Sequence, residues 1–267
     1  MRNTIILVAL IFVACKTPQQ TVVSNQQLHP ENVSLNGKLF TSLFQQRAAE
    51  YRALCYQAYN TARTAIINYK PTSNKPLAII TDIDETLVDN SPYAVHQAYS
   101  GNEYTLQTWY EWTAKSAADT LAGARAFLNF CHQQNVQVFY VTNRDEVERT
   151  ATINNLIKFN LPYADNEHLI LKNKVSSKEQ RRQDILKNYE VILYMGDNLA
   201  DFSMLFDKKT EEERSKNVDL VSAEFGKKFI VLPNANYGEW ESALYQYKHN
   251  YTQAQKDSIM KVVLKGY

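Results

Sequence analysis

Apolar residues in this chain form short unbroken runs that alternate with longer amphipathic stretches. Five of the runs have the length and composition of buried β-strands and lie at residues 77–81, 136–141, 169–171, 191–195 and 229–232. Helical patterns lie at residues 39–69, 119–134, 146–159, 176–188 and 210–227, and Pro71 ends the first of them. Strands that alternate with helices predict an α/β fold, a doubly wound parallel sheet with helices on both faces.

A further apolar run, at the N-terminus, is longer than the predicted strands and ends at a cysteine. Residues 5–14 are ten consecutive apolar residues followed by Cys15. Ten residues make a helix of about 15 Å, half of what a bilayer core requires, so residues 1–14 are predicted to be a signal peptide. The ending at Cys15 resembles a bacterial lipobox, which implies lipidation of Cys15 and a membrane lipoprotein, in the outer membrane and facing the periplasm or the cell surface. The alternative is a secreted protein without a lipid anchor.

The remaining sequence divides into a tether and one folded domain. Residues 15–37 are polar with little periodicity and are predicted to tether the lipid anchor to a domain at residues 38–267. Residues 89–125 separate the first strand from the next core helix and are predicted to form a small helical cap.

Polar side chains follow four of the predicted strands, and those after the last one lie in residues 233–237. In parallel sheets of this kind, ligands bind at the carboxyl ends of the strands, so we expect these side chains to form one site. The set comprises Asp82, Asp84, Thr142, Asn143, Arg144, Asp197 and Asp201.

Four carboxylates at one sheet edge repel one another unless their pKa values rise or a cation joins them. Mg²⁺ takes oxygen ligands and commonly combines one or two carboxylates with a substrate phosphate. We therefore expect Asp82 and Asp197 to bind Mg²⁺, together with a backbone carbonyl near Asp84. Asp201 lies four residues after Asp197 and is placed to orient a metal-bound water.

The composition of the chain excludes some classes of function but does not identify a single one. The 267 residues carry a net charge of +1, which argues against binding of a nucleic acid polymer through phosphate neutralisation. The 17 tyrosines are an excess of aromatic surface that packs in a core or lines a pocket for flat ligands. Cys55 and Cys131 are expected to be free thiols, although an oxidising compartment would permit a disulfide between them.

The strand-end motifs resemble those of the haloacid-dehalogenase (HAD) superfamily, and more narrowly the class C acid phosphatases, the bacterial "e" lipoprotein 5′-nucleotidase family. The resemblance runs from about residue 51 to residue 240 and rests on the segments 82–93, 138–144, 191–202 and 232–240. One departure is Ala200, where the family often has a further Asp.

The resemblance implies a Mg²⁺-dependent phosphomonoesterase with a covalent intermediate. Asp82 would attack phosphorus and form an aspartyl-phosphate, and Asp84 would first protonate the leaving oxygen and then deprotonate water. Thr142 and a lysine would stabilise the transferring phosphoryl group. Lys172, Lys174 and Lys178 are candidates for this lysine, and the resemblance favours Lys178.

The substrates that the resemblance implies are 5′-nucleoside monophosphates, nicotinamide mononucleotide among them. Trp109 in the insertion and Tyr237 in the last strand-end loop would sandwich the base, with Asn143 and Arg144 also binding substrate. The alternatives are a surface lipoprotein that binds haem or nucleotide without turnover and a phosphotransferase. The oligomeric state stays open, a homodimer included.

Overall fold

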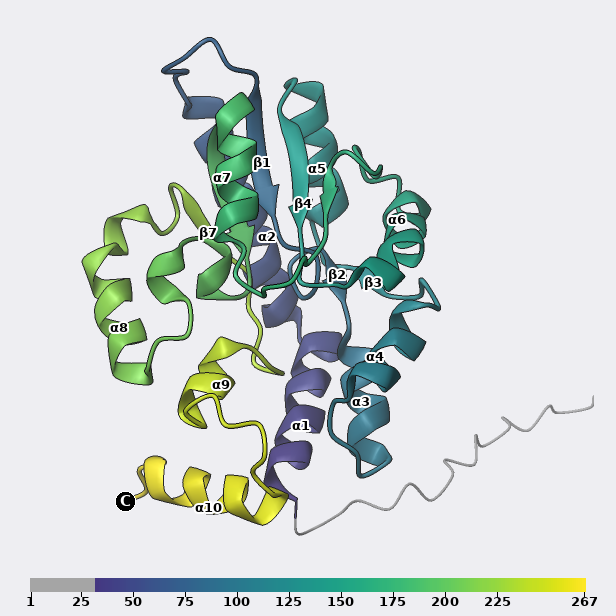
Figure 1. Ribbon diagram of the computed structural model, residues 1–267, viewed down its shortest axis with the longest axis vertical. Coiled ribbons are helices and arrows are strands. Elements are labelled where there is room, and N and C mark those ends of the chain that lie inside the picture. The colour runs from purple at the N-terminus through teal and green to yellow at the C-terminus, as the bar shows by residue number, and fades with distance from the viewer. Residues whose placement is uncertain (1–31) are drawn as a thin grey trace, which may run out of the picture.

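The computed structural model describes residues 32–267 and is built around a parallel sheet of five strands (Figure 1). The strands are β1 (Leu77–Thr81), β4 (Gln137–Val141), β5 (Leu169–Ile170), β6 (Glu190–Gly196) and β7 (Phe229–Val231). Their order in the sheet is β5-β4-β1-β6-β7, and all neighbours are parallel. The predicted doubly wound α/β fold is confirmed.

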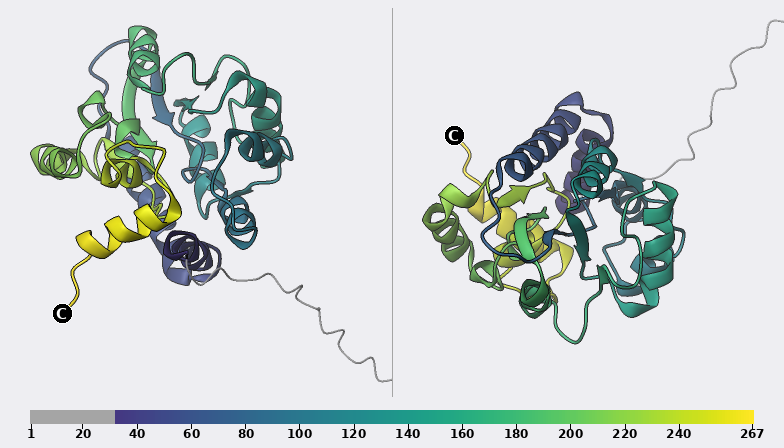
Figure 2. Two further views of the ribbon diagram at one scale, coloured as in Figure 1. Left: turned by 60° about the horizontal axis from the view of Figure 1, so that its bottom comes forward. Right: turned by 90° about the horizontal axis from the view of Figure 1, so that it is seen from above.

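Successive residues of the central strands point into two different apolar cores. In β1, Ile79 packs in one core, and its neighbours Ala78 and Ile80 pack in the other. The period of two is that of a pleated strand, and burial on both faces explains why these strands are continuous apolar runs. Helices therefore cover both faces of the sheet, as the views in Figure 2 show.

Helices pack against both faces of the sheet. α2 and α5 contribute to the core on one face, and α7 contributes Ile185 to the core on the other. The bounds are α2 (Ala49–Asn68), α5 (Ala124–Gln133), α6 (Arg149–Lys158), α7 (Glu179–Asn188), α8 (Glu211–Leu220), α9 (Glu239–Leu244) and α10 (Gln253–Val263).

The segment between β1 and α5 holds two helices and a short antiparallel ribbon. The helices are α3 (Ser91–Tyr99) and α4 (Leu106–Thr113), and the ribbon pairs β2 (Val88–Asp89) with β3 (Asp119–Thr120). A proline in the first turn of α3 and a capping box at Thr105 before α4 define where these helices start. We refer to residues 88–120 as the cap.

The prediction of one long helix over residues 39–69 is wrong, because the chain forms two helices there. α1 (Val33–Arg47) and α2 are separated by Ala48, whose backbone is extended. α1 starts earlier than the predicted domain boundary at residue 38, because the side chain of Asn32 accepts a hydrogen bond from the backbone N–H of Leu35 and caps the helix. Leu43 on α1 and Tyr56 on α2 are exposed, although both are apolar or aromatic residues of this stretch.

Several predictions for the N-terminal region lie outside the described residues. The signal peptide, Cys15 and all but the end of the tether are among them, so the lipid anchor stays a prediction. Within residues 32–267, no helix is both long enough and apolar enough to cross a membrane. Cys55 and Cys131 are buried free thiols in the core, as expected.

The buried carboxylate of Glu190 holds the loop that precedes β1 through several hydrogen bonds. Glu190, the first residue of β6, accepts hydrogen bonds from the Tyr69 hydroxyl (2.7 Å) and the backbone N–H groups of Thr72 (2.7 Å) and Ser73 (2.8 Å). The hydroxyls of Thr72 and Ser73 also donate to it. These donors, Ser73 and Tyr69 foremost, lower the pKa of Glu190 to about 2.

We predict that Glu190 stabilises the protein near neutral pH and that acid removes this stabilisation. A depressed pKa contributes stability above the unfolded-state pKa of about 4.3 and loses it as the pH falls toward 2. Between pH 5 and pH 2, the free energy of unfolding should therefore fall more steeply in the wild type than in Glu190→Gln, measured by urea unfolding. The exposed-site variant Glu167→Gln is the control, and equal slopes in wild type and Glu190→Gln would contradict the prediction.

Candidate active site

Three carboxylates meet at the carboxyl edge of the sheet. Asp82 directly follows β1, Asp197 directly follows β6, and Asp201 lies in the 3₁₀ turn after it. One oxygen from each carboxylate lies within 4.8 Å of the others. A Cβ at Gly196 would collide with the Asp201 carboxylate, so glycine at the end of β6 is what lets Asp201 fold back against the strand.

Lys178 supplies the positive charge nearest to these carboxylates. Its Nζ lies 2.5 Å from Oδ1 of Asp82 and 2.6 Å from Oδ1 of Asp201, at the start of α7. Burial lowers the pKa of Lys178, but Asp201 and Asp82 outweigh burial and raise it. Of the three candidate lysines, Lys178 lies in the site, whereas Lys172 pairs with Asp145 at 2.8 Å.

The donor set fits a hard divalent cation. Burial raises the pKa of Asp197 well above its usual value, and the charges of Asp201 and Asp82 add to the effect. Burial likewise raises the pKa of Asp82 to about 7, although Lys178 opposes it. Three oxygen-donor carboxylates with one ammonium leave an excess of negative charge that a bound cation would neutralise. The residues that could hold it are Asp82, Asp197 and Asp201.

Asp84 lies outside this carboxylate cluster and is held by a buried arginine. Nη2 of Arg144 lies 2.7 Å from Oδ1 of Asp84, and Nε lies 3.1 Å from Oδ2. Nδ2 of Asn90 donates to Oδ1 from the other side at 2.9 Å. The two oxygens of Asp84 are thus fixed by a fork of donors, an arrangement that orients a carboxylate firmly.

The structure changes the interpretation of Arg144. Its guanidinium is buried and bonds Asp84 and the Thr152 hydroxyl, the latter at 3.0 Å. Arg144 therefore holds Asp84 in position, and the expectation that it also binds substrate stays a prediction. The expected contribution of Asp84 to metal binding was a backbone carbonyl, and its carboxylate is not part of the cluster.

Thr142 and Asn143 directly follow β4, beside the site. Thr142 is buried, and its Oγ1 accepts a hydrogen bond from the backbone N–H of Arg144 at 3.2 Å. Asn143 is exposed, and its Oδ1 accepts from Arg181 at 2.6 Å. Arg181 also donates to the carbonyl of Thr142 at 2.6 Å and so ties α7, with Lys178, to the end of β4. Sequence analysis missed Arg181, because a helical arginine carries no signal of its own.

A second buried carboxylate, Glu85, lies behind Asp84 and was also missed. It accepts hydrogen bonds from the backbone N–H of Asn90 at 2.8 Å and from the hydroxyl of Tyr237. Burial, and then the charge of Asp84, raise the pKa of Glu85 to about 8. Its backbone is left-handed, with φ at 52°. The glutamate next to the Asp-x-Asp motif was visible in the sequence, but its burial was not.

The aromatic residues that were expected to bind substrate lie on two different elements. Trp109 on α4 packs edge-on against Tyr93 at 5.2 Å between ring centres. Tyr237 lies in the loop after β7 and is tied to Glu85 by its hydroxyl. Trp112 donates its indole N–H to Asn90 at 2.8 Å, consistent with a structural role. The sandwich of a base between Trp109 and Tyr237 stays a prediction.

The family is shown by comparison with known proteins. A family model described as HAD superfamily, subfamily IIIB (acid phosphatase), matches residues 7–240. The chain belongs to this acid phosphatase family.

Solved structures and a curated sequence of acid phosphatases are similar to the chain. The class C acid phosphatase from Bacillus anthracis has a TM-score of 0.84 at 37% identity, over 88% of this chain and 100% of that one. The same type of enzyme from that organism with tungstate bound gives 0.82 at 36% identity, over 88% and 99%. Acid phosphatase 1 from Solanum lycopersicum is 27% identical over 135 residues, which are 46% of this chain and 50% of that protein. The match spans only half the length of that curated relative.

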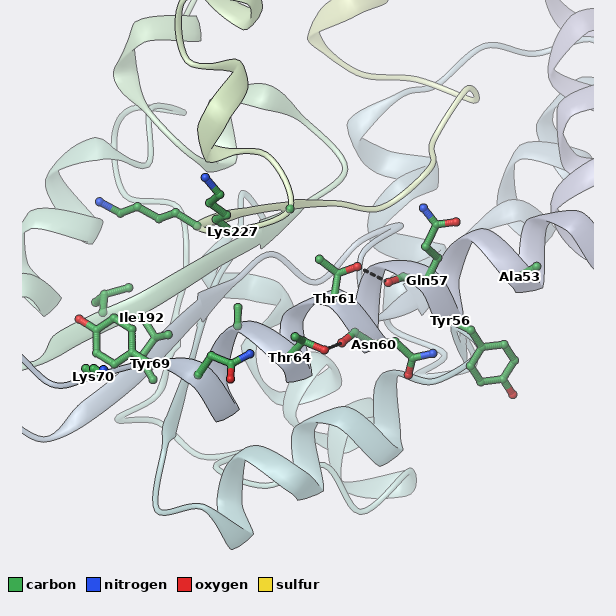
Figure 3. A pocket seen from close by; sticks show the side chains of 15 residues that line it. Ala53, Tyr56, Gln57, Asn60, Thr61, Thr64, Tyr69, Lys70, Ile192 and Lys227 are labelled. Atoms are coloured by element: carbon green, nitrogen blue, oxygen red, sulfur yellow. Dashed lines mark hydrogen bonds between the residues drawn. The ribbon is translucent and has the colours of Figure 1, made fainter.

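A groove in this acid phosphatase family member lies away from the carboxylates. A groove of about 1240 Å³ runs along the exposed side of α2 and past the start of β6, at the opposite edge of the sheet (Figure 3). Amide and hydroxyl side chains such as Asn60 and Thr64 line it, with Lys227 near one end. None of the three clustered carboxylates lines this groove.

We predict that metal removal makes stability depend on pH through the carboxylate cluster. A raised carboxyl pKa means that the folded state binds more protons, so stability is lost as the pH rises from about 4 to about 7. In EDTA, the free energy of unfolding should fall over this range, and excess Mg²⁺ should restore it. Asp197→Asn should show a smaller fall in EDTA. Identical pH profiles with and without Mg²⁺, measured by calorimetry, would refute the prediction.

Proposed function

We propose that the protein is a phosphomonoesterase that hydrolyses phosphate monoesters through an aspartyl-phosphate on Asp82. The observation that carries the proposal is the placement of Asp82 in a cluster of three carboxylates, with Lys178 in contact and Asp84 held separately by Arg144. A site that only bound its ligand would need neither a nucleophile nor a fixed acid. Tungstate, a tetrahedral oxyanion, is bound to the similar phosphatase from Bacillus anthracis, which supports a phosphoryl site.

The reaction proceeds in two displacements at phosphorus. A carboxylate oxygen of Asp82 attacks phosphorus in line, the bond from phosphorus to the leaving oxygen breaks, and Asp84 donates its proton to that oxygen. Asp84 then accepts a proton from the water that attacks the aspartyl-phosphate. The bond from phosphorus to the Asp82 oxygen breaks, and inorganic phosphate leaves with Asp82 and the proton of Asp84 restored.

The surrounding residues stabilise charge on the transferring group. Lys178 and the Thr142 hydroxyl provide donors for the phosphoryl oxygens, and Arg144 with Asn90 holds Asp84 in one orientation. We propose Mg²⁺ as the cation held by Asp82, Asp197 and Asp201, where it would neutralise negative charge on the phosphoryl group.

The proposed substrates are 5′-nucleoside monophosphates, nicotinamide mononucleotide among them. The proposal is supported by the aromatic faces of Trp109 on the cap and Tyr237 on the loop after β7, both only partly buried. Every base has a face that stacks on such rings, so broad specificity among nucleotides is expected.

We predict that Asp82→Asn abolishes the covalent intermediate, whereas Asp84→Asn slows its formation and breakdown. Loss of the nucleophile should reduce kcat by several orders of magnitude and leave no acid-stable phosphoprotein after quenching with radiolabelled substrate. Loss of the acid should reduce kcat about 10²- to 10⁴-fold. Asp219→Asn on the exposed side of α8 is the control. Labelled protein from Asp82→Asn would refute the covalent mechanism.

We predict that Trp109→Ala selectively impairs nucleotide turnover. Loss of one stacking platform should lower kcat/KM for a nucleoside monophosphate about fivefold to 150-fold and leave glycerol phosphate nearly unaffected. Tyr56→Ala removes an exposed ring on α2 (Figure 3) and is the control. An equal loss for both substrates would show that Trp109 has only a packing role.

A further inference from the structure

α1 buries two polar side chains, Ser42 and Gln45, beside the apolar Leu35, and it exposes several apolar ones, which is unusual for a surface helix. Ser42 is fully buried and Gln45 is 5% exposed, whereas Phe40 is 75% exposed. Burial of an amide is unfavourable unless its donors and acceptor are bonded. The partners of Gln45 therefore indicate what α1 contributes to the protein.

The amide of Gln45 joins two elements that are far apart in the sequence. Its Nε2 donates to Oδ1 of Asp89 at 2.8 Å, and its Oε1 accepts from Nδ2 of Asn236 at 2.9 Å. Ser42 adds a longer contact from its hydroxyl to Asn236 at 3.3 Å. Asp89 is the last residue of β2 at the base of the cap, and Asn236 lies in the loop after β7.

On the loop side, the bonds of Gln45 lead to the carboxylate cluster. The backbone N–H of Asn236 donates to Oδ1 of Asn234 at 2.8 Å, and Nδ2 of Asn234 donates to Asp197 at 2.8 Å. The next residue, Tyr237, is bonded to Glu85 behind the site. Residues 233–237 are thus held at three points, one of which is α1.

On the cap side, the hydrogen bonds of Gln45 lead through Asp89 to the start of α3, the first helix of the cap. Asp89 also accepts from the backbone N–H of Ser91 at 2.8 Å, the first residue of α3. Gln46, next to Gln45, donates to the Ser91 hydroxyl at 2.8 Å. α1 lies alongside α3, with α9 and the loop before it on its other side (Figure 1).

We propose that Gln45 is a positioning residue that sets the spacing between the cap and the loop at residues 233–237. By fixing this spacing, it fixes how far Trp109 lies from Tyr237 and so determines which flat leaving groups fit between them. We call the hydrogen bonds of Gln45 to Asp89 and Asn236 the bridge. The effect on specificity rests on the proposed stacking of nucleotides, whereas the bridge itself does not. Gln45 bonds none of Asp82, Asp84, Lys178 or the other cluster carboxylates.

Steady-state kinetics test the specificity consequence. Gln45→Ala should raise KM for a nucleoside monophosphate about fivefold to tenfold, which is the effect of losing one or two buried hydrogen bonds. Both kcat and the constants for glycerol phosphate should stay within about twofold. Gln57→Ala, an exposed glutamine on α2, is the matched control. An unchanged nucleotide KM, or an equal loss for both substrates, would overturn the specificity role.

Exchanging the donor and the acceptor of the hydrogen bond between Gln45 and Asp89 distinguishes loss of the bridge from a general loss of packing. Gln45→Glu places a carboxylate against Asp89 and should raise the nucleotide KM through like-charge repulsion. Adding Asp89→Asn supplies an amide donor to that carboxylate and should restore the KM toward the wild-type value. Failure of the second substitution to rescue a folded protein would contradict the bridge.

Hydrogen exchange tests the bridge without any substrate. In Gln45→Ala, residues 233–237 and residues 88–91 should both exchange faster, while β1 and β6 stay protected. If Trp109→Ala affects nucleotides and glycerol phosphate equally, the stacking proposal fails, but faster exchange in both segments would still support the bridge. Unchanged exchange in both segments would overturn it, whatever the substrates are.

Discussion

The mutual repulsion of Asp82, Asp197 and Asp201 is the constraint on which the active end of this structure depends. Three carboxylates within 4.8 Å of one another are unfavourable in a buried site, and folding places them there because two adjacent parallel strands end together. Lys178 neutralises part of the negative charge of these carboxylates. Its helix, α7, must therefore lie against the ends of β1 and β4. Arg181 on the same helix secures that contact through Thr142.

A separate ion pair, between Arg144 and Asp84, keeps Asp84 apart from the cluster of three carboxylates. Asp84 is bound by the fork of Arg144 rather than by a shared cation, so the two aspartates of one short motif lie in different electrostatic environments. This difference suits the two roles proposed for these aspartates, because a nucleophile benefits from positive charge beside it and an acid must exchange a proton. Arg144 is almost completely buried, so losing Asp84 would leave an unpaired charge inside the protein.

The strands and the location of the site could be predicted from sequence, because each depends on local pattern. Apolar runs such as residues 77–81 identify buried strands, and the polar residues that follow them must meet at one edge. The helix at residues 39–69 was predicted less well. Its period continues across Ala48, and only the packing of α1 against the cap shows that the chain turns there.

The sequence by itself determined the fold class, the family motifs and the identity of the carboxylates, since strand periodicity and motif spacing are local properties. Tertiary structure alone decided that Arg144 holds Asp84, that Glu85 is buried against Tyr237, and that Gln45 joins the cap to the last loop. Each of these contacts joins residues remote in the chain, and each side chain could equally have faced solvent. Which polar groups become buried, and so must find partners, is settled only when the elements pack.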